Sequence, residues 1–355
     1  MNIMVYAGRL SLSILFCFML ITAAYGRVIY VSPSGSDSNS GLSPQRPLFT
    51  IQHAIDTARA GDVIVLQPGI YRQNFSFTRS GKPEEPIILE GMPGSLILGD
   101  TKPGGRIIQI KASYIVLKHL NVNGHFVSCD QLKCYHDKLV YVVGSPKKYL
   151  TGIKILYSQF KNAYGECLRI RFSRDVEIAG NSISYCGLRD FRFGRGRQNG
   201  EGIYVGTSPK QLPAGVKDLT RDVYIHDNVI ATHGSECVDV KEATTNVRII
   251  NNVCLDEMSP YVGSVSIRGN NSTVSGNIFF NNRGAGVRLG GNPAGYGILN
   301  SVIGNYFDSN AVCAIKIMRV PQGKICGNSV GPDQKCLIYP KGLFKRFSRA
   351  FESCR

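Results

Sequence analysis

The segment "VRIINNVC" (residues 247–254) contains the pattern that decides the fold. In this pattern an apolar residue is followed by two spacers, an asparagine and a further apolar position. It also occurs at residues 176–183, 223–230, 273–279, 301–307 and 324–330. Its asparagines are Asn181, Asn228, Asn252, Asn277, Asn305 and Asn328. After the first interval, which spans two periods or one period with a long insertion, the pattern recurs about every 25 residues.

A second short strand lies between these segments. It occurs as "ECLRIR" (166–171), "EGIYVG" (201–206), "ECVDVK" (236–241), "GSVSIR" (263–268), "GVRLG" (286–290) and "AIKIM" (314–318). The alternation has a period of two, which is typical of strands and not of helices. Two strands per repeat, with asparagine and glycine at the corners, predict an all-β fold: a single-stranded right-handed parallel β-helix, whose clearest coils span residues 107–330.

Further features complete this solenoid. The repeated asparagines are most simply turn residues, which tolerate left-handed backbone and bond along the stack. An amphipathic pattern near the front of the chain has one apolar face formed by Ile51, Ala54, Ile55 and Ala58. We predict an N-terminal capping helix there, because the first coil would otherwise present unpaired strand edges. The polar segment that contains Cys336 and Cys354 is expected to close the other end.

The first residues predict secretion. A single arginine precedes an apolar run from Leu10 to about Ala24, and small residues follow, which is typical of a cleaved signal peptide over residues 1–26. The run is short for a membrane span and no second one follows. We therefore expect residues 27–355 to form one secreted, extracellular domain, a monomer that no membrane holds.

Ten of the eleven cysteines follow the signal peptide. An even number of cysteines in an oxidising compartment predicts disulfides, and the spacings do not resemble zinc sites. The simplest pairing joins neighbours: Cys129–Cys134, Cys167–Cys186, Cys237–Cys254, Cys313–Cys326 and Cys336–Cys354. Secretion also makes Asn74, Asn270 and Asn271 candidate glycosylation sites.

The formal net charge of +16 favours acidic partners through long-range attraction. For a secreted protein this indicates an acidic polysaccharide and not a nucleic acid. A basic surface that only aids solubility is the simpler alternative.

Stacked coils place equivalent residues of the second strand in columns about 4.8 Å apart. In "ECVDVK" we expect Val238 and Val240 to face inward, and Cys237, Asp239 and Lys241 to face outward. The first outward column is Arg169, Tyr204, Asp239, Ser266, Arg288 and Lys316. The next is Arg171, Gly206, Lys241, Arg268, Gly290 and Met318. One face therefore carries a stripe of cations with Asp239 in its midst.

Three of these strands begin with a glutamate, namely Glu166, Glu201 and Glu236. Close carboxylates are unfavourable unless they share a proton or a cation. For Glu166 the simpler interpretation is pairing with the arginines. For Glu201 and Glu236, the additional oxygens of Asn199 and Asp239 favour a hard cation such as calcium.

The stretch from Asn199 to Gly290 resembles the polysaccharide lyase family that contains chondroitinase B and related alginate lyases. The matching pieces are "NGEGIYVGTS", "GSECVDVK", "GSVSIRGNNSTVSGNIFFNN" and "GAGVRLGG". The segment from Ile29 to Tyr71 is similar to the start of many secreted β-helix lyases, including relatives of pectate lyases.

The resemblance implies specific roles for residues. Lys241 matches the catalytic base, Arg268 its partner, Glu236 a calcium ligand and Asn199 a second ligand. Gly234 stands where the family pattern has another acidic ligand, a role that Asp239 or Glu201 would have to take.

These roles predict β-elimination in a uronate polymer. Lys241 would take the C5 proton in its neutral form, with its pKa lowered by Arg268 and calcium, and Tyr204 is a candidate donor to the leaving oxygen. The expected substrate-binding residues are Arg288, Tyr204, Lys316 and Arg171. With no tryptophan present, sugar stacking would fall to tyrosines such as Tyr204 or Tyr261.

Two other functions stay open. A non-catalytic matrix protein could bind acidic glycans through the basic stripe. A glycoside hydrolase would need two carboxylates at a set separation, and Glu236 and Asp239 have cationic neighbours that suit elimination better. His233, next to the site, is more simply a loop residue than a general base.

Overall fold

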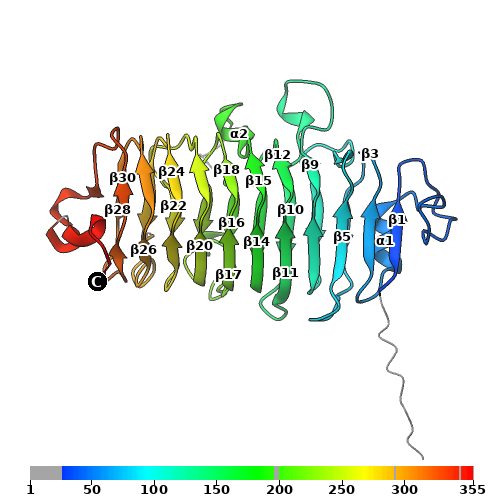
Figure 1. Cartoon of the computed structure of the whole chain (residues 1–355), viewed down its shortest axis with the longest axis horizontal. Coiled ribbons are helices and arrows are strands. Elements are labelled where there is room, and N and C mark those ends of the chain that lie inside the picture. The colour runs from blue at the N-terminus through cyan, green and yellow to red at the C-terminus, as the bar shows by residue number, and fades with distance from the viewer. Residues whose placement is uncertain (1–25, 196–199, 292, 344, 355) are drawn as a thin grey trace, which may run out of the picture.

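The computed structural model describes residues 26–195, 200–291, 293–343 and 345–354. It is a right-handed parallel β-helix whose coils stack along the long axis of the molecule (Figure 1). The predicted fold class is thus confirmed, and the coils extend beyond the predicted range of 107–330, from Val28 to Tyr339. The predicted signal peptide lies outside the described residues except for Gly26.

Each coil contributes strands to three parallel sheets. The first sheet contains β1 (Val28–Val31), β2 (Val63–Leu66), β5 (Ile87–Gly91), β8 (Ile115–Lys118), β11 (Leu150–Leu156), β14 (Ser173–Ala179), β17 (Arg221–His226), β20 (Thr245–Ile250), β23 (Thr273–Ser275), β26 (Ser301–Ile303) and β29 (Ile325–Cys326). The second contains β4 (Phe75–Phe77), β7 (Arg106–Ile110), β10 (Lys138–Val143), β13 (Leu168–Arg171), β16 (Ile203–Val205), β19 (Val238–Val240), β22 (Gly263–Ile267), β25 (Ala285–Leu289), β28 (Cys313–Ile317) and β31 (Ile338–Tyr339). The third contains β3 (Gly69–Tyr71), β6 (Ser95–Ile97), β9 (Asn121–Asn123), β12 (Gln159–Lys161), β15 (Ser182–Ser184), β18 (Val229–Ala231), β21 (Val253–Leu255), β24 (Ile278–Phe280), β27 (Tyr306–Asp308) and β30 (Ser329–Val330).

Helical segments are short. The α-helices are α1 (Ile51–Thr57) and α2 (Leu188–Phe191), and the 3₁₀ segments are η1 (Leu132–Cys134), η2 (Pro209–Gln211), η3 (Lys341–Leu343) and η4 (Lys345–Phe351). Within the described ranges, no helix is long and apolar enough to cross a membrane.

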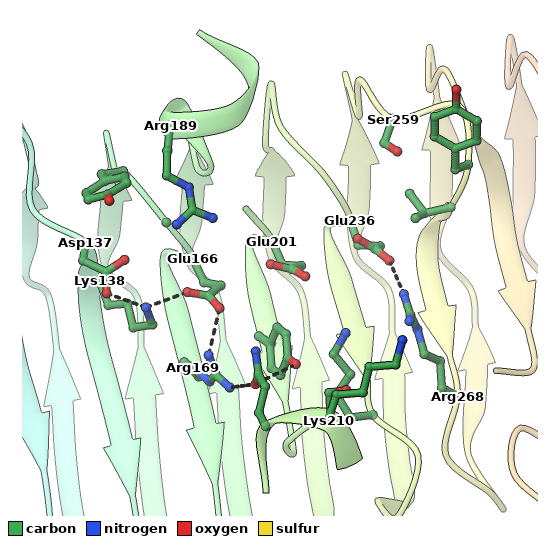
Figure 2. Close-up of a pocket in the computed structure, with 18 of the residues that line it drawn as sticks. Asp137, Lys138, Glu166, Arg169, Arg189, Glu201, Lys210, Glu236, Ser259 and Arg268 are labelled. Carbon is green, nitrogen blue, oxygen red and sulfur yellow. Dashed lines mark hydrogen bonds and ion pairs between the residues drawn. The ribbon is translucent and has the colours of Figure 1, made fainter. Parts of the chain in front are cut away.

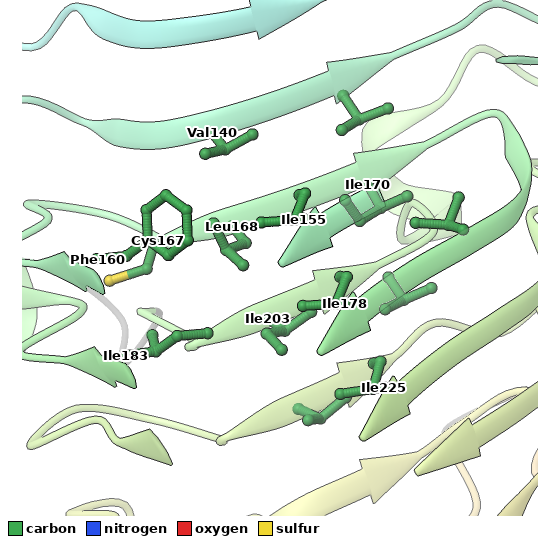
Figure 3. Packing of buried hydrophobic residues seen from close by; sticks show 14 of the residues in the cluster. Val140, Ile155, Phe160, Cys167, Leu168, Ile170, Ile178, Ile183, Ile203 and Ile225 are labelled. Atoms are coloured by element: carbon green, nitrogen blue, oxygen red, sulfur yellow. The ribbon is translucent and has the colours of Figure 1, made fainter. Parts of the chain in front are cut away.

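The interior is filled by the inward positions of the strands. Val238 pairs with Val265, which pairs with Val287, and all three side chains are fully buried. Figure 3 shows the same stacking in earlier coils, where Ile155, Ile178 and Ile225 of the first sheet face the second sheet across the core. Period-two alternation therefore places one apolar residue of each pair inside, as predicted.

The repeated asparagines form a buried ladder along one corner. The Asn181 Nδ2 donates to Asn228 Oδ1 at 2.9 Å, and each following asparagine repeats this bond to the next as far as Asn328. The ladder confirms the predicted hydrogen bonding of the asparagines along the stack of coils. The left-handed backbone instead belongs to the residue before each asparagine, for example Asp227 (φ +55°) and Gly276 (φ +66°).

Both ends of the helix are covered. Helix α1 lies beside β1 (Figure 1), and its side chains Ile51, Ala54 and Ile55 are buried, which confirms the capping helix. Its first turn is capped by the Thr50 side chain, which accepts from the His53 N–H at 3.2 Å. At the other end, the predicted closing segment packs on the core through four side chains, Leu337, Leu343, Phe347 and Phe351.

Four disulfides occur in the described residues. Cys129–Cys134 and Cys167–Cys186 confirm the neighbour pairing. The pairing predicted for the last four cysteines is wrong, since the bonds are Cys313–Cys336 and Cys326–Cys354. Cys313 and Cys336 lie in consecutive coils, whereas Cys326 is bonded to the closing segment, so stacking decides the partners.

Cys237 and Cys254 are buried free thiols, which differs from the predicted bond. Cys237 also belongs to the hydrophobic core and does not face outward, because it precedes β19, where the chain is still turning.

Two predicted glycosylation acceptors differ in their surroundings. Asn271 is exposed. The Asn270 side chain donates to the Gly295 carbonyl at 3.1 Å and accepts from the Ile298 N–H at 3.1 Å.

Candidate active site

A groove of about 940 Å³ runs across the outer face of the second sheet. Its floor comes from consecutive coils, and Figure 2 shows Lys138, Glu166, Glu201, Glu236 and Arg268 following one another along it. The direction of the groove therefore follows the axis of the β-helix.

The predicted outward column exists in full register. Arg169 pairs with Tyr204, Tyr204 with Asp239 and Asp239 with Ser266, and the series continues through Arg288 to Lys316. Several members are nonetheless buried, with Asp239 fully buried and Arg288 8% exposed. Residues of the connecting segments, such as Lys210, Gln211 and Tyr261, line the groove beside this column, so the column is part of a groove and not an open stripe.

Three carboxylates form a cluster, of which Glu201 and Glu236 line the groove and Asp239 lies beneath them. Oxygen atoms of Glu201, Glu236 and Asp239 all lie within 4.8 Å of one another, and all three residues are buried. The Gly200 N–H donates to Glu201 Oε2 at 2.9 Å, and the Ser235 hydroxyl donates to Glu236 Oε2 at 2.5 Å. The predicted metal ligands are thus brought together, except for Asn199, which lies outside the described residues.

The three carboxyl groups differ in their electrostatic surroundings. Burial raises the pKa of Glu201 to about 8, although Lys241 partly opposes this shift. Burial would also raise the pKa of Asp239, but Arg268 and Lys241 outweigh it and hold that pKa below its usual value. Glu201 is therefore the member of the cluster with the least compensated charge.

Lys241 lies between the carboxylates and Tyr204. Its Nζ contacts Asp239 Oδ2 and lies 4.3 Å from the centroid of the Tyr204 ring. Burial lowers the pKa of Lys241, but Asp239 outweighs burial and raises the pKa above its ordinary value. Arg268 does lower the pKa of Lys241, but by less than Asp239 raises it. The prediction of a lowered pKa is therefore wrong for the chain without a bound ion.

Arg268 joins the cluster from the coil that follows. Its NH2 donates to Glu236 Oε1 at 3.2 Å, and its Nε lies 3.2 Å from Asp239 Oδ1. The predicted neighbours Lys241 and Arg268 therefore share one carboxylate.

The earlier part of the groove is a closed network of ion pairs. Glu166 accepts from Lys138 at 2.8 Å and from Arg169 at 3.0 Å, and Lys138 also contacts Asp137 at 2.5 Å. Glu166 is thus paired with cations, as predicted, and is not a member of the acidic cluster.

Other predicted residues lie at the margin or outside. Arg171 donates to the Thr207 hydroxyl and to the Tyr141 hydroxyl, each at 2.9 Å, which holds its guanidinium away from the groove lining. Tyr261 lines the groove and is 68% exposed. His233 stacks on Tyr185 with ring centroids 4.3 Å apart and does not line the groove.

Gly234 has a steric explanation. A Cβ built at this position would lie 2.1 Å from the Cys186 carbonyl oxygen. A side chain cannot fit there without moving the backbone, so the acidic ligand expected at this position is excluded by packing.

Sequence reasoning missed Gln211. Its Oε1 accepts from Arg169 NH2 at 2.5 Å and lies 3.5 Å from the Tyr204 hydroxyl, so it links two residues of the column. Gln211 belongs to the insertion between β16 and β17. The long first interval between the asparagines signalled this insertion, which lies within a single coil.

Solved structures share this fold. An alginate lyase from Paenibacillus sp. str. FPU-7 matches with a TM-score of 0.70 at 19% identity, over 88% of this chain and 97% of that chain. Pectate lyase Pel9A matches with a TM-score of 0.58 at 15% identity, over 90% and 78%. A glycoside hydrolase matches with a TM-score of 0.62 at 11% identity, over 88% and 95%. Identities this low show a common fold alone, one found in lyases and a glycosidase.

Curated relatives match over short segments. "Pectate lyase PEL9" of Emericella nidulans is 38% identical over 89 residues, which are 24% of this chain and 22% of the relative. "Uncharacterized protein YwoF" of Bacillus subtilis is 37% identical over 62 residues, which are 18% of this chain and 13% of the relative. The chain therefore matches less than a quarter of the length of either relative.

One family model covers most of the chain. It is described as "Protein of unknown function (DUF1565)" and matches residues 33–328. With its β-helix fold and this extended match, the protein belongs to the DUF1565 family.

Proposed function

We propose that this protein is a secreted polysaccharide lyase that cleaves an acidic, uronate-containing polysaccharide by calcium-assisted β-elimination. One observation carries the proposal: Lys241, Tyr204 and a buried acidic cluster meet in one groove. Elimination needs a proton acceptor, a proton donor and positive charge near the substrate carboxylate, and these residues supply or recruit all three.

The acidic cluster fits a calcium ion. Calcium takes several oxygen ligands, and the three carboxylates offer oxygens within 4.8 Å of one another. The raised pKa of Glu201 indicates a carboxyl group that lacks a counter-ion. We assign Glu201, Glu236 and Asp239 to the ion, with Asn199 as a further ligand. When bound, calcium would neutralise the substrate carboxylate on which negative charge develops.

Lys241 is assigned to removing the proton at C5 of the uronate. The electrons of that C–H bond form the C4–C5 double bond as the C4–oxygen bond breaks. Lys241 can accept the proton only when neutral, and Asp239 holds it protonated in the free chain. Proton transfer therefore requires that another cation compensate the charge of Asp239, which makes the reaction depend on an ion at the cluster.

Tyr204 is assigned to protonating the leaving oxygen. Burial raises the pKa of Tyr204 to about 12, so the phenol keeps its proton until a stronger base forms beside it. Lys241 can then return its proton to the phenolate, because its ammonium group lies over the ring. Arg268 stays charged and is assigned to holding the substrate carboxylate, with Arg288 and Lys316 as further substrate-binding residues. Arg171, which is held by Thr207 and Tyr141, is not assigned to the substrate.

A non-catalytic glycan-binding protein is the second candidate. The observation that favours it is the contact between Lys241 and Asp239, which keeps the assigned base protonated. Such a protein would bind acidic polysaccharide in the same groove without cleaving it.

Incubation with alginate, pectate, dermatan and chondroitin in calcium distinguishes the two functions. We expect one of these substrates to give ultraviolet-absorbing unsaturated product, and chelation to stop its formation. Binding to an acidic polymer without product from any of the four would instead support the second candidate. The four disulfides fit folding in an oxidising compartment, so we propose that the protein acts outside the cell as a monomeric single domain.

A further inference from the structure

Two cations beyond the acidic cluster are not neutralised. Arg288 is 8% exposed, and in the described part of the chain no hydrogen bond or ion pair reaches its guanidinium. Lys316, the next residue in the column, donates to the Tyr261 carbonyl at 3.4 Å and to no other group of the described residues. Burial and the neighbouring Arg268 lower the pKa of Arg288, as expected for a cation without a counter-ion.

The carboxylates nearest to Arg288 are already engaged. Glu236 and Asp239 both contact Arg268, and Asp239 also contacts Lys241. A third carboxylate, Glu242, attracts Arg288 at longer range without an ion pair to it. These carboxylates therefore attract Arg288 only in part, since burial and Arg268 outweigh them.

The other end of the column behaves differently. Arg169 has Glu166 at 3.0 Å and Gln211 at 2.5 Å, and its guanidinium carbon lies 4.4 Å from the centroid of the Tyr204 ring. An equally buried arginine of the same column thus has a carboxylate and an amide partner for its two terminal nitrogens, although its Nε, like that of Arg288, has no hydrogen-bond partner in the described residues. Arg169 and Arg288 therefore differ in ion pairing, and the arginine without an ion pair lies on the C-terminal side of the acidic cluster.

A buried, unpaired arginine is unfavourable in the free protein unless a ligand supplies an anion. We propose that Arg288 and Lys316 form a second anion subsite, which binds an acidic substituent of the glycan two to three coils, or roughly 10 to 15 Å, from Asp239 of the acidic cluster. This inference rests on the proposed function and deepens it. The substrate then carries acidic groups at repeated positions and not only at the cleaved bond, and it extends past β25 toward the C-terminal end of the β-helix.

Binding measured in the presence of a chelator tests the subsite without turnover. The probes are an alginate hexasaccharide, whose acidic groups are carboxylates, the same hexasaccharide with its carboxyl groups reduced, and an ι-carrageenan oligosaccharide, whose acidic groups are sulfates. The variants are Arg288→Met, Lys316→Met and the control Arg248→Met. Arg248 lies on β20 of the first sheet, with its guanidinium carbon 4.5 Å from the centroid of the Tyr224 ring. The substitution Arg248→Met therefore removes the same charge from another face of the molecule.

We expect Arg288→Met to weaken binding of an acidic probe about tenfold, Lys316→Met to weaken it less, and neither to affect the reduced hexasaccharide. The acidic probe that responds identifies carboxylate or sulfate as the ligand. Arg288→Met should also raise the melting temperature of the free protein, by about 2 °C, since it removes an uncompensated buried charge.

Three results would overturn the subsite: unchanged binding of both acidic probes by Arg288→Met and Lys316→Met, an equal loss with the reduced probe, or an equal loss in Arg248→Met. If no polysaccharide is cleaved but the binding pattern holds, the lyase proposal fails and the subsite stands. If product forms and Arg288→Met binds normally, the lyase proposal stands and the subsite fails.

Discussion

The asparagine ladder and the groove column are both stacks of buried polar residues from the same repeat, but they differ in how their polar atoms are satisfied. In the ladder, Asn252 Nδ2 donates to two carbonyls and to the next asparagine, and its Oδ1 accepts from the preceding one. Beside the acidic cluster, the buried Glu242 Oε2 and Arg288 Nε have no hydrogen-bond partner in the described residues.

This difference indicates that the ladder has a structural role, whereas the groove column belongs to the candidate site. Buried polar groups in folded proteins are normally hydrogen-bonded, and exceptions mark sites where a ligand or ion completes the bonding. The ladder is closed on itself and stabilises the coils. The groove column is open, because Arg288 has no ion pair in the described part of the chain.

The largest effect on turnover is expected from substitution of Lys241. Lys241→Arg should lower turnover about 10²- to 10⁴-fold, because guanidinium does not give up its proton at accessible pH. The arginine keeps a positive charge beside Asp239, so the melting temperature should stay close to that of the native chain. Lys241→Ala should be equally inactive but less stable, since it leaves Asp239 with one cation fewer. Native-like turnover in Lys241→Arg would refute the assignment of the base.

The ladder should respond in stability and not in chemistry. Asn252→Ala removes a side chain with several buried hydrogen bonds and leaves its partners unsatisfied, which should lower the free energy of unfolding by about 3 kcal/mol. Urea denaturation measures this. The neighbouring Asn251→Gly is a control, because Asn251 is exposed and its positive φ of +55° suits glycine. Equal loss in both variants would contradict a special role of the ladder.

The acidic cluster should respond to metal. Glu236→Ala should lower activity at limiting calcium by about tenfold or more, and excess calcium should partly restore it. The comparison variant is Glu177→Ala. Glu177 lies on the first sheet, far from the cluster, and its carboxylate pairs with Lys154 at 2.8 Å. Activity of the native chain that persists after chelation would argue against calcium.

The smallest effect concerns Glu257, which supports the segment that carries Ser259 and Tyr261 into the groove. Burial raises the pKa of Glu257 from 4.5 to about 8, despite N–H donation by Gly284 at 2.9 Å. Between these values the folded state keeps a proton that the unfolded state has lost. Its contribution to stability is therefore complete below about pH 4.5 and is lost progressively as the pH rises to about 8.

Glu257→Gln should remove that slope. Denaturant unfolding across this pH range checks it, with the native chain measured alongside. If both proteins show the same pH dependence of unfolding, Glu257 does not carry a raised pKa.

Much of this molecule follows from local periodicity. The alternation in "ECVDVK" places Val238 and Val240 inside, and the repeat spacing aligns Tyr204, Asp239 and Ser266 in register. Both depend only on the order of residues within a coil, which repeats along the chain, so they could be predicted from the sequence.

Other features depend on contacts that no period encodes. Cys313 bonds to Cys336 because their coils stack, not because they are neighbours in sequence. Gln211 reaches Tyr204 from an insertion whose path follows its own packing.

By itself, therefore, the sequence determined the β-helix, its inward residues, the asparagine ladder and the strands that carry the candidate site. Three features depend instead on tertiary contacts: Asp239 holds Lys241 protonated, Gly234 has no room for a side chain, and the Arg288 Nε has no hydrogen-bond partner within the described residues. Repetition sets which face a residue occupies, whereas charge pairing and burial depend on distances between coils and loops that arise only when the chain is folded.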